Sequence, residues 1–422
     1  MRATKNSGFE WIGEIPTSWE LYKGKYMFTQ RNLRGNTIEL QLLSPTQKYG
    51  VVPQSVYEDR SGMNAVKLNE NANLSALKTI HKGDFCISLR SFQGGFEYSE
   101  YEGVVSPAYQ VFYPVVKVAR GYYRYLFKDS GFIEKMNSYT MTLRDGKNIA
   151  FADFGNTYIP CPPVDEQQRI ADFLDTKCAE IDALTADIQT QIDTLEQYKR
   201  SVITETVTKG LDPNAEMKDS GVQWIGNMPS HWEVIRGKYI LRYMQKPVHE
   251  DDGVITCFRD GEVTLRSNRR EDGFTMSDKE IGYQGIDVGD LVVHGMDGFA
   301  GSIGISDSRG KASPVLNVLD TDQHKRYIMY YLRSMAYSDV FLALATGIRV
   351  RSCDLRWNKL AELSYPVPPL DEQNAIVKHI DSVLSKADAV IADKKAQLAT
   401  LDEYKKSLIF EYVTGKKEVP IS

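Results

Sequence analysis

Basic side chains gather in four short stretches of the sequence, and these stretches offer its most distinctive chemistry. Arginine and lysine can hold phosphates, arginine can also bind the edge of guanine, and glutamine or asparagine suits adenine. The stretches therefore predict contacts to nucleic acid, with an ordinary solvated charged surface as the alternative. The candidates are Arg90, Ser91, Phe92 and Gln93 in SLRSFQGGF; Arg144, Lys147 and Asn148 in LRDGKN; Arg259, Arg266, Arg269 and Arg270 in RDGEVTLRSNRR; and Arg349 and Arg351 in GIRVRS.

Two more candidates, His294 and Asp297, follow the strand-like run DLVV, although His294 fits a satisfied loop histidine equally well. No catalytic motif accompanies them. The sequence has no GxxxxGK[ST], no HExxH and no zinc-ligand spacing, and GFAGSIG reads as a turn rather than a dinucleotide loop. We therefore expect no catalytic residue, metal or cofactor in this chain.

The composition of the chain is that of an ordinary globular protein, with 42% hydrophobic and 25% charged residues. Five scattered cysteines without a CxxC pair, no signal-like N-terminus and no membrane-length apolar run predict a cytoplasmic protein with free thiols. The net charge of −5 argues mildly against a nucleic-acid binder unless the basic residues are clustered.

One unit is written twice along the chain. SGFEWIGEIPTSWE, from Ser7, returns as SGVQWIGNMPSHWE, from Ser220, and GKY follows both copies. PPVDEQQRI, from Pro162, returns as PPLDEQNAI, from Pro368. The first pair is offset by 213 residues and the second by 206, so the second middle is seven residues shorter, and the loss lies before Gly83. This cyclic order predicts a pseudo-two-fold molecule.

Each PP-DEQ phrase predicts the start of a long helix. Two prolines favour an extended approach, Asp165 is a good N-cap, and Gln168 completes a capping box; Asp371 begins the second copy. Each helix should run about 44 residues, or roughly 65 Å at 1.5 Å per residue.

A heptad pattern along both helices predicts that they pair as a coiled coil. Its intervening d-type positions are assigned to Leu184 and Tyr198 in the first helix, and to Val383, Val390 and Tyr404 in the second. Ala387 and Lys394 interrupt the main row of the second helix. The main rows consist of Leu174, Ile181, Ile188, Leu195 and Val202, and of Ile380, Leu401 and Leu408.

The two middles combine strand-like runs such as DFCISLR and DLVVHGM with amphipathic helices, which indicates an α/β or α+β class. We expect four segments. Two globular domains occupy residues 1–163 and 213–369, and two helical segments occupy residues 164–212 and 370–422.

The repeated phrases resemble those of the specificity subunits of type I restriction–modification systems. IPCPPVDEQQRIADFLD and YPVPPLDEQNAIVKHID look like the family's conserved-region starts, and EWIGEIPTSWE and QWIGNMPSHWE look like the runs before its variable domains. The resemblance covers the whole chain, and its motifs occur twice in the family's order.

The resemblance implies a non-catalytic subunit with two target recognition domains, each reading one half of a split DNA sequence. Two antiparallel helices would set the unread spacer between the halves. Two methyltransferase subunits would dock, and motor-nuclease subunits could join; those partners would use S-adenosylmethionine, ATP and Mg²⁺. The target bases and the spacer length depend on side-chain poses that no sequence pattern gives.

Two other interpretations remain open from the sequence. The chain could be a coiled-coil scaffold whose middles bind proteins and not DNA, or, least in keeping with its motifs, a self-contained enzyme. DNA binding that weakens steeply with salt would separate a reader from a scaffold.

Overall fold

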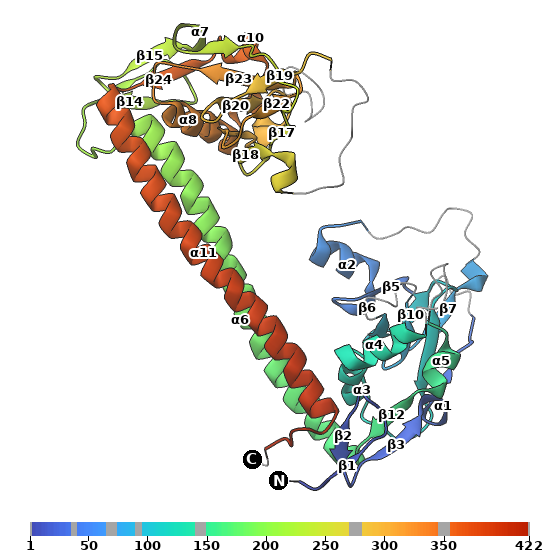
Figure 1. Cartoon of the computed structure of the whole chain (residues 1–422). Helices are drawn as coiled ribbons and strands as arrows, with labels where there is room; N and C mark the ends of the chain where they lie inside the picture. Colours follow the sequence, from blue (N-terminus) through green and yellow to red (C-terminus); the bar gives the residue numbers. More distant parts are fainter. Residues whose placement is uncertain are drawn as a thin grey trace. The chain divides into compact units, whose positions relative to one another are not determined.

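The computed structural model describes residues 2–34, 40–64, 74–88, 95–139, 149–269, 281–344 and 355–420 (Figure 1). The chain divides into two compact units. Unit 1 comprises Met1–Ile188 and Ala396–Ser422, and unit 2 comprises Gln189–Lys395. Each unit therefore contains one globular part and half of each long helix.

The phrases SGFEWIGEIPTSWE and SGVQWIGNMPSHWE, called the WIG phrases below, fold in the same way at the start of each globular part. A short antiparallel hairpin is followed by a strand and a one-turn helix, and the tryptophan that closes the phrase, Trp19 or Trp232, is fully buried. In unit 1 these elements are β1 (Thr4–Asn6), β2 (Glu14–Pro16), β3 (Glu20–Lys23) and α1 (Gly24–Met27). In unit 2 they are β13 (Met217–Asp219), β14 (Asn227–Pro229), β15 (Glu233–Arg236) and α7 (Gly237–Ile240).

A four-stranded antiparallel sheet forms the centre of each globular part. The strand order is β4-β11-β8-β9 in unit 1 and β16-β23-β20-β21 in unit 2, so the unlike middles share one topology. The strands of unit 1 are β4 (Phe28–Gln30), β8 (Phe85–Ile87), β9 (Phe96–Tyr98) and β11 (Gln110–Pro114). Those of unit 2 are β16 (Arg242–Met244), β20 (Leu291–His294), β21 (Ile303–Ile305) and β23 (Leu316–Asp320).

Two further strand pairs flank each sheet, and the shortened stretch of unit 2 lies between them. In unit 1 the pairs are β5 (Leu43–Thr46) with β6 (Gly50–Pro53), and β7 (Lys78–Ile80) with β10 (Gly103–Val105). In unit 2 they are β17 (Ile255–Cys257) with β18 (Val263–Leu265), and β19 (Gln284–Ile286) with β22 (Gly310–Ala312). The offset falls from 213 at the start of β6 to 206 at the start of β7, which confirms that the loss precedes Gly83. After β6 unit 1 has α2 (Gln54–Ser61), whereas after β18 unit 2 has the 3-10 turn η3 (Arg266–Asn268).

Short helices connect each sheet to the long helix that follows. In unit 1 they are α3 (Arg120–Leu126), α4 (Ser130–Ser138) and α5 (Phe151–Asn156), ahead of β12 (Tyr158–Cys161). In unit 2 they are α8 (Lys325–Tyr337), α9 (Val340–Ala343) and α10 (Trp357–Leu360), ahead of β24 (Ser364–Val367). β12 pairs with β3, and β24 pairs with β15. The PP-DEQ phrase that starts each long helix therefore lies beside the WIG phrase of the same repeat.

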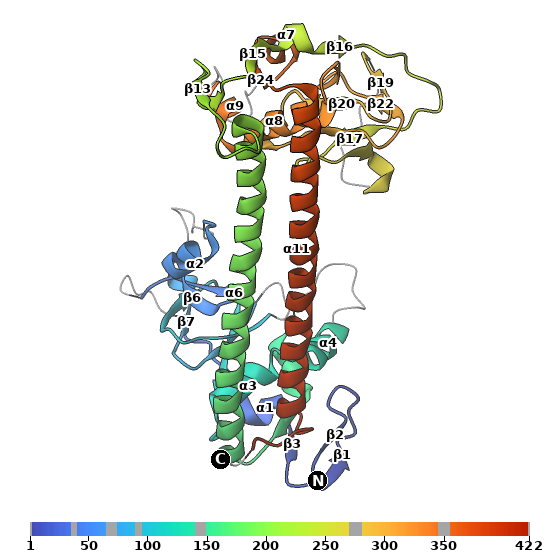
Figure 2. The same ribbon diagram turned by 90° about the vertical axis from the view of Figure 1, so that its left-hand side faces the viewer.

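The long helices α6 (Val164–Lys209) and α11 (Leu370–Val413) are continuous over 46 and 44 residues, or about 69 and 66 Å. Figure 2 shows them packed along one another. Lys405 Nζ lies 2.5 Å from Asp182 Oδ1 in unit 1, and Lys199 Nζ lies 2.6 Å from Asp388 Oδ1 in unit 2. Because low numbers in one helix face high numbers in the other within each unit, the pair is antiparallel.

The contact seam between the helices differs from the expected d-type positions. Val383 is partly buried, but the other four expected positions are wrong. Leu184, Tyr198, Val390 and Tyr404 are 45–55% exposed, whereas Cys178, Ile192, Ile391 and Tyr412 are buried. The second row therefore lies four residues after the main row, where the sequence pattern had placed it three residues after. Apolar residues at either spacing share a face of an isolated helix, and only the partner helix selects between them. In the main rows, Leu174, Ile181, Ile188, Ile380 and Leu408 are buried, and Leu195, Val202 and Leu401 are partly buried.

The start of α6 also differs from expectation. The helix begins at Val164, and the backbone N–H groups of Glu166 and Gln167 both donate to the Pro163 carbonyl at 2.9 Å. Asp165 is therefore not the N-cap but a first-turn residue, where its carboxylate faces the positive end of the helix dipole. Gln168 binds Asp172 along the helix surface and does not cap the helix.

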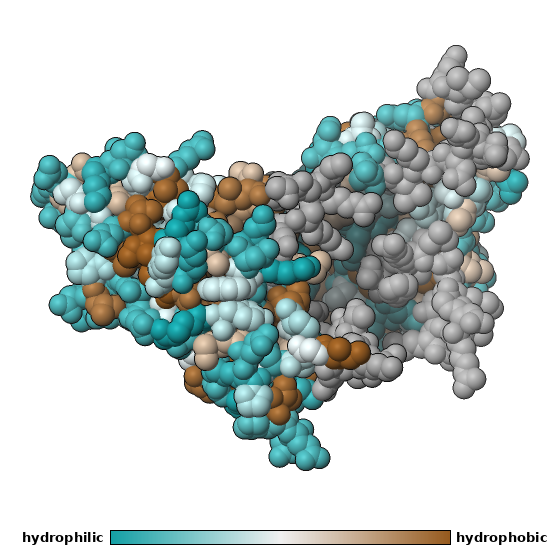
Figure 3. Space-filling model, turned by 90° about the horizontal axis from the view of Figure 1, so that it is seen from above, coloured by the Kyte–Doolittle hydropathy of each residue, from teal (hydrophilic) through white to brown (hydrophobic). Residues whose placement is uncertain are grey.

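Figure 3 shows one face on which hydrophilic residues dominate and apolar ones form small groups. Among the described helices, none combines the length and apolarity needed to cross a bilayer. The described residues include no group of three or more potential metal ligands. The four cysteines in these ranges, Cys86, Cys161, Cys178 and Cys257, are free.

Candidate nucleic-acid interface

Three of the candidate residues of unit 2 come together beyond the end of β20. His294 closes that strand, Asp297 follows it, and Arg259 lies in the turn between β17 and β18. Arg259 Nη2 is 3.1 Å from Asp297 Oδ1, and the Arg259 side chain is 65% exposed. The pair thus presents a guanidinium donor beside a carboxylate acceptor, a combination suited to the exposed edges of guanine and cytosine.

His294 has a defined role inside this group. Its Nδ1 accepts hydrogen bonds from the backbone N–H of Met296, at 3.2 Å, and of Asp297, at 2.9 Å. Burial lowers the pKa of His294, and the charge of Arg259 lowers that pKa further, against the opposing effect of Asp297. The imidazole is therefore neutral near pH 7, with its remaining proton on Nε2, so it shapes the loop rather than adding positive charge.

Two more candidates, Arg266 and Arg269, lie on the adjoining 3-10 turn. Arg269 pairs with Asp260 at 2.8 Å and with Glu262 at 3.0 Å, and its guanidinium lies 4.2 Å from the centre of the Phe258 ring. Arg266 Nε donates to Thr256 Oγ1 at 3.3 Å. Because carboxylates balance the arginines here, this surface favours directional hydrogen bonds over general attraction of phosphates.

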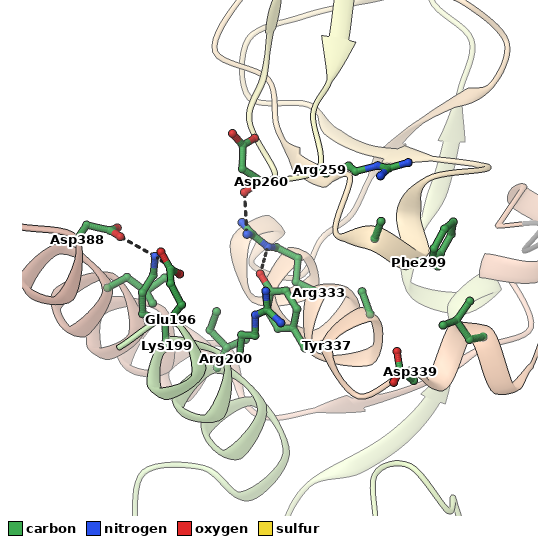
Figure 4. Close-up of a pocket in the computed structure, with 15 residues that line it drawn as sticks. Glu196, Lys199, Arg200, Arg259, Asp260, Phe299, Arg333, Tyr337, Asp339 and Asp388 are labelled. Atoms are coloured by element: carbon green, nitrogen blue, oxygen red, sulfur yellow. Dashed lines mark hydrogen bonds and ion pairs between the residues drawn. The ribbon is translucent and has the colours of Figure 1, made fainter. Parts of the chain in front are cut away.

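A pocket with a volume of about 660 Å³ lies beside this group, between the helix pair and the globular part of unit 2 (Figure 4). Arg259, Asp260 and Phe299 line its outer side, and Lys199 and Arg200 of α6 line its inner side. Arg333 of α8 crosses its floor and donates to the Asp260 carbonyl and the Tyr337 hydroxyl, both at 2.8 Å. Its lining mixes both charges with apolar surface, so no single ligand class is favoured.

The remaining candidates lie outside the residues that the structure describes. They are Arg90, Ser91, Phe92, Gln93, Arg144, Lys147 and Asn148 in the first half, and Arg270, Arg349 and Arg351 in the second.

Several described basic residues stabilise the fold instead of forming an interface. Arg31 pairs with the buried Asp84 at 2.6 Å, and Lys246 pairs with the equivalent Asp290 at 2.7 Å. Each aspartate also accepts a backbone N–H in its own turn, at 3.0 Å in unit 1 and 2.8 Å in unit 2. The repeated Gly-Asp of KGDF and VGDL is thus explained by turn geometry.

The sequence patterns missed the residue that attaches each long helix to its globular part. Gln167 Oε1 accepts from the Ala119 N–H at 2.9 Å, and its Nε2 donates to the Pro162 carbonyl at 2.8 Å. Gln373 makes the same two bonds, to the His324 N–H and the Pro368 carbonyl, at 2.9 and 2.8 Å. Both side chains are fully buried. Their identity in the two DEQ phrases was the available signal.

A tyrosine in each unit attaches the end of the opposite helix. Tyr122 donates to the Val413 carbonyl of α11 at 2.7 Å, and Tyr327 donates to the Val207 carbonyl of α6 at 3.1 Å. Because Val207 and Val413 are equivalent in the repeat, each unit holds the start of one helix and the end of the other. The end of one repeat and the start of the next therefore lie together within each unit, as the cyclic order of the sequence predicts.

Comparison with known proteins agrees with this repeated architecture. The family model for the type I restriction modification DNA specificity domain matches residues 17–194. The chain is therefore similar to the specificity subunits of type I restriction–modification systems. A putative MjaX specificity subunit from Methanocaldococcus jannaschii is 25% identical over 62% of this chain and 59% of its own length. The EcoBI specificity subunit from Escherichia coli is 22% identical over 68% of this chain and 64% of its own length.

Solved structures of the family share the fold. A subunit from a study of complex assembly and conformational transition in a type I system matches with a TM-score of 0.69 at 15% identity, over 96% of this chain and 99% of its own. An HsdS subunit from Thermoanaerobacter tengcongensis matches with a TM-score of 0.51 at 14% identity, over 98% and 100% of the two chains. The chain spans about three fifths of the length of the curated MjaX relative, and the likeness to the solved structures shows the fold.

Proposed function

We propose that this chain is the DNA-reading subunit of a type I restriction–modification complex. Each unit reads one half of a bipartite target, and α6 and α11 fix the number of unread base pairs between the halves. The observation that carries the proposal is the pair of units with one topology and unlike side chains. That is the arrangement that two different half-sites require.

Contacts to DNA are assigned to the variable loops. In unit 2 the exposed Arg259–Asp297 pair supports this assignment, since both side chains present hydrogen-bonding groups at the surface. The assigned residues are those named from the sequence: Arg90, Ser91, Phe92, Gln93, Arg144, Lys147 and Asn148, and Arg259, Arg266, Arg269, Arg270, His294, Asp297, Arg349 and Arg351.

Catalysis belongs to partner subunits in this proposal. Methyltransferase subunits using S-adenosylmethionine, and motor-nuclease subunits using ATP and Mg²⁺, would act in the cytoplasm on the DNA that this chain selects. The outward side chains of the helices support protein docking. Leu184 and Tyr404 in unit 1, and Tyr198 and Val390 in unit 2, leave apolar surface exposed at equivalent places.

The deciding experiment is sequencing of DNA methylation in cells that carry this chain with its methyltransferase partner. We expect one split motif with two half-sites at a fixed spacing. An active methyltransferase that leaves no split motif would contradict the proposal. Inserting seven residues into both α6 and α11 should then lengthen the spacer by roughly 10.5 Å, about three base-pair steps.

Binding of the purified chain to random duplex DNA separates this proposal from a DNA-free scaffold. We expect fluorescence anisotropy to report binding at low salt that weakens linearly on a log–log plot as salt rises. A scaffold would give no binding at any salt concentration.

A further inference from the structure

The short helix after each WIG phrase carries an exposed lysine and an exposed tyrosine that are the same in both units. Lys23, Gly24, Lys25 and Tyr26 in unit 1 answer Arg236, Gly237, Lys238 and Tyr239 in unit 2. Tyr26 is 63% exposed and Tyr239 is 74% exposed, the latter among the most exposed large side chains described. We call each of these four-residue segments a basic–tyrosine turn.

Packing explains the glycine of each turn but not its neighbours. A Cβ on Gly24 would lie 2.7 Å from the Phe154 carbonyl oxygen, and one on Gly237 would lie 2.3 Å from that of Leu360. Only glycine fits these close approaches to α5 and α10. The lysine and tyrosine point outward, with the ammonium 5.6 Å from the ring centre in unit 1 and 5.5 Å in unit 2. Because the fold does not require this lysine and this tyrosine, their identity in the two units indicates a shared task outside the fold.

The charge at the turns favours an anion. In unit 1 the cations contact neutral groups: Lys25 Nζ is 3.3 Å from the Asn156 amide oxygen, and Lys23 lies over the Tyr158 ring. In unit 2 one carboxylate, Glu362, meets both Arg236 and Lys238, at 3.9 and 3.2 Å. Each turn thus retains positive charge beside a phenol hydroxyl, and lysine, arginine and tyrosine are common ligands of DNA phosphates.

The position of the turns agrees with this chemistry. α1 packs on α5, which begins three residues after the assigned Asn148, and α7 adjoins the end of α10, which begins six residues after Arg351. Phosphate contacts carry no sequence information, so two units that read different bases can use the same residues for them. Residues that read different bases would differ between the units, whereas the lysine and the tyrosine of the two turns are the same.

We propose that the two basic–tyrosine turns bind the DNA phosphate backbone and orient each unit on the duplex. This inference rests on the proposed DNA-reading function and extends it by separating positioning from reading. The turn of unit 1, with neutral partners, contributes more to affinity than that of unit 2, where Glu362 offsets the charge.

The test measures the salt dependence of DNA binding by the full chain carrying Lys25→Gln and Lys238→Gln. We expect the log–log salt slope to fall by about 2 while the half-sites and spacer in the methylome stay the same. Lys25→Gln alone should weaken binding more than Lys238→Gln alone. The double variant Tyr26→Phe, Tyr239→Phe loses only two hydroxyl donors. Because phosphate contacts carry no sequence information, it should weaken binding to all DNA sequences alike.

The matched control is Lys395→Gln, an exposed lysine of α11 whose equivalent in α6 is Gln189. This variant should leave the salt slope of DNA binding close to that of the unaltered chain. All variants should keep the unfolding midpoint of the unaltered chain. An unchanged slope in the double lysine variant would overturn the inference, and so would failure of that variant to assemble with the methyltransferase while it still binds DNA normally. If the unaltered chain binds no duplex DNA, the proposed function itself fails.

Discussion

The cores of the two units fill the same frame with different side chains. Phe85, Phe112 and Phe154 of unit 1 occupy the places of Leu291, Val318 and Leu360 of unit 2, offset by 206 residues in each case. In unit 1 the rings contact one another, with Phe28 edge-on to Phe85, Phe112 and Phe154 at 5.7–5.9 Å between centroids. Unit 2 uses aliphatic residues and the buried tyrosines of α8.

This difference shows which parts of the repeat are held in common. The side chains that attach the helices are identical, as with Gln167 and Gln373, whereas the residues that fill the sheet have diverged freely. A core tolerates such exchange as long as its volume and pattern are kept. The surfaces built on the two cores can therefore diverge while the frame is preserved.

The WIG phrase shows a second contrast. Glu166 accepts from the indole Nε1 of Trp19 at 3.1 Å and pairs with Arg2. The equivalent Glu372 meets His231 Nε2 at 2.8 Å, and the buried Nε1 of Trp232 has no hydrogen-bond partner among the described residues. At the first tryptophan of the phrase the contrast is reversed, because Trp224 Nε1 donates to the Tyr331 hydroxyl at 3.2 Å and the buried Nε1 of Trp11 has no hydrogen-bond partner among the described residues. Each unit thus leaves one indole N–H of the phrase unsatisfied.

The largest expected effect is in the core of unit 1. Phe154→Ala should lower the free energy of unfolding by about 3–5 kcal/mol, because it removes a ring at the centre of the aromatic cluster. Chemical denaturation followed by tryptophan fluorescence measures it. Leu360→Ala, its equivalent, should cost about 2–5 kcal/mol and act on unit 2. Equal loss in both units from either variant would show that they unfold as one.

Replacing the buried glutamine should lower the free energy of unfolding by the same amount in the two units. Gln167→Leu or Gln373→Leu strips a buried N–H and a buried carbonyl of their partner, so each variant should lose about 1–3 kcal/mol of unfolding free energy. Hydrogen exchange at Ala119 and His324 would locate the effect. A clear cost in only one unit would break the equivalence.

The stability of unit 1 should also depend on the pH through Glu97. Burial raises the pKa of this carboxyl to about 7, although Lys128 lies 2.7 Å away and opposes the rise. The unfolded chain releases that proton near its ordinary value of 4.5, so stability should fall as the pH rises from about 4.5 to 7 and then level. The difference between the two pKa values corresponds to a change of about 3 kcal/mol.

Glu97→Gln should remove this pH dependence, as read from unfolding midpoints at several pH values. Glu97 has no acidic counterpart between Ile303 and Ile305, the equivalent stretch of unit 2. Unfolding of unit 2, followed in the Leu360→Ala variant over the same pH range, therefore serves as the comparison. A slope that persists in the Glu97→Gln variant would assign the effect to another group.

The smallest expected effect concerns the helix pair. Lys199–Asp388 and Lys405–Asp182 are equivalent through the repeat and both aspartates are largely exposed. A double-mutant cycle to alanine should give a coupling of about 0.2–1 kcal/mol for each pair, falling with added salt. A coupling well above that range at one pair only would distinguish the two halves of the coiled coil.

The sequence predicted much of the frame. The repeat, the position of the seven-residue loss, the α+β class and the two long helices were all readable, because each depends on matching phrases or on local periodicity. The site was less accessible. Arg259, His294 and Asp297 were named from separate stretches, but their contact depends on how the β17–β18 turn lies against the end of β20.

The sequence by itself determined that the chain is a cyclic repeat with two helices capable of pairing, since identical phrases and heptads are properties of the chain order. Only the tertiary structure decided which helix face pairs, so that Ile192 and Ile391 are buried while Tyr198 and Val390 are exposed. It also decided that Gln167, and neither Asp165 nor Gln168, fixes the helix to its unit. Spacings of three and four residues are equivalent along one helix, and a buried hydrogen bond needs a partner that lies far away in sequence.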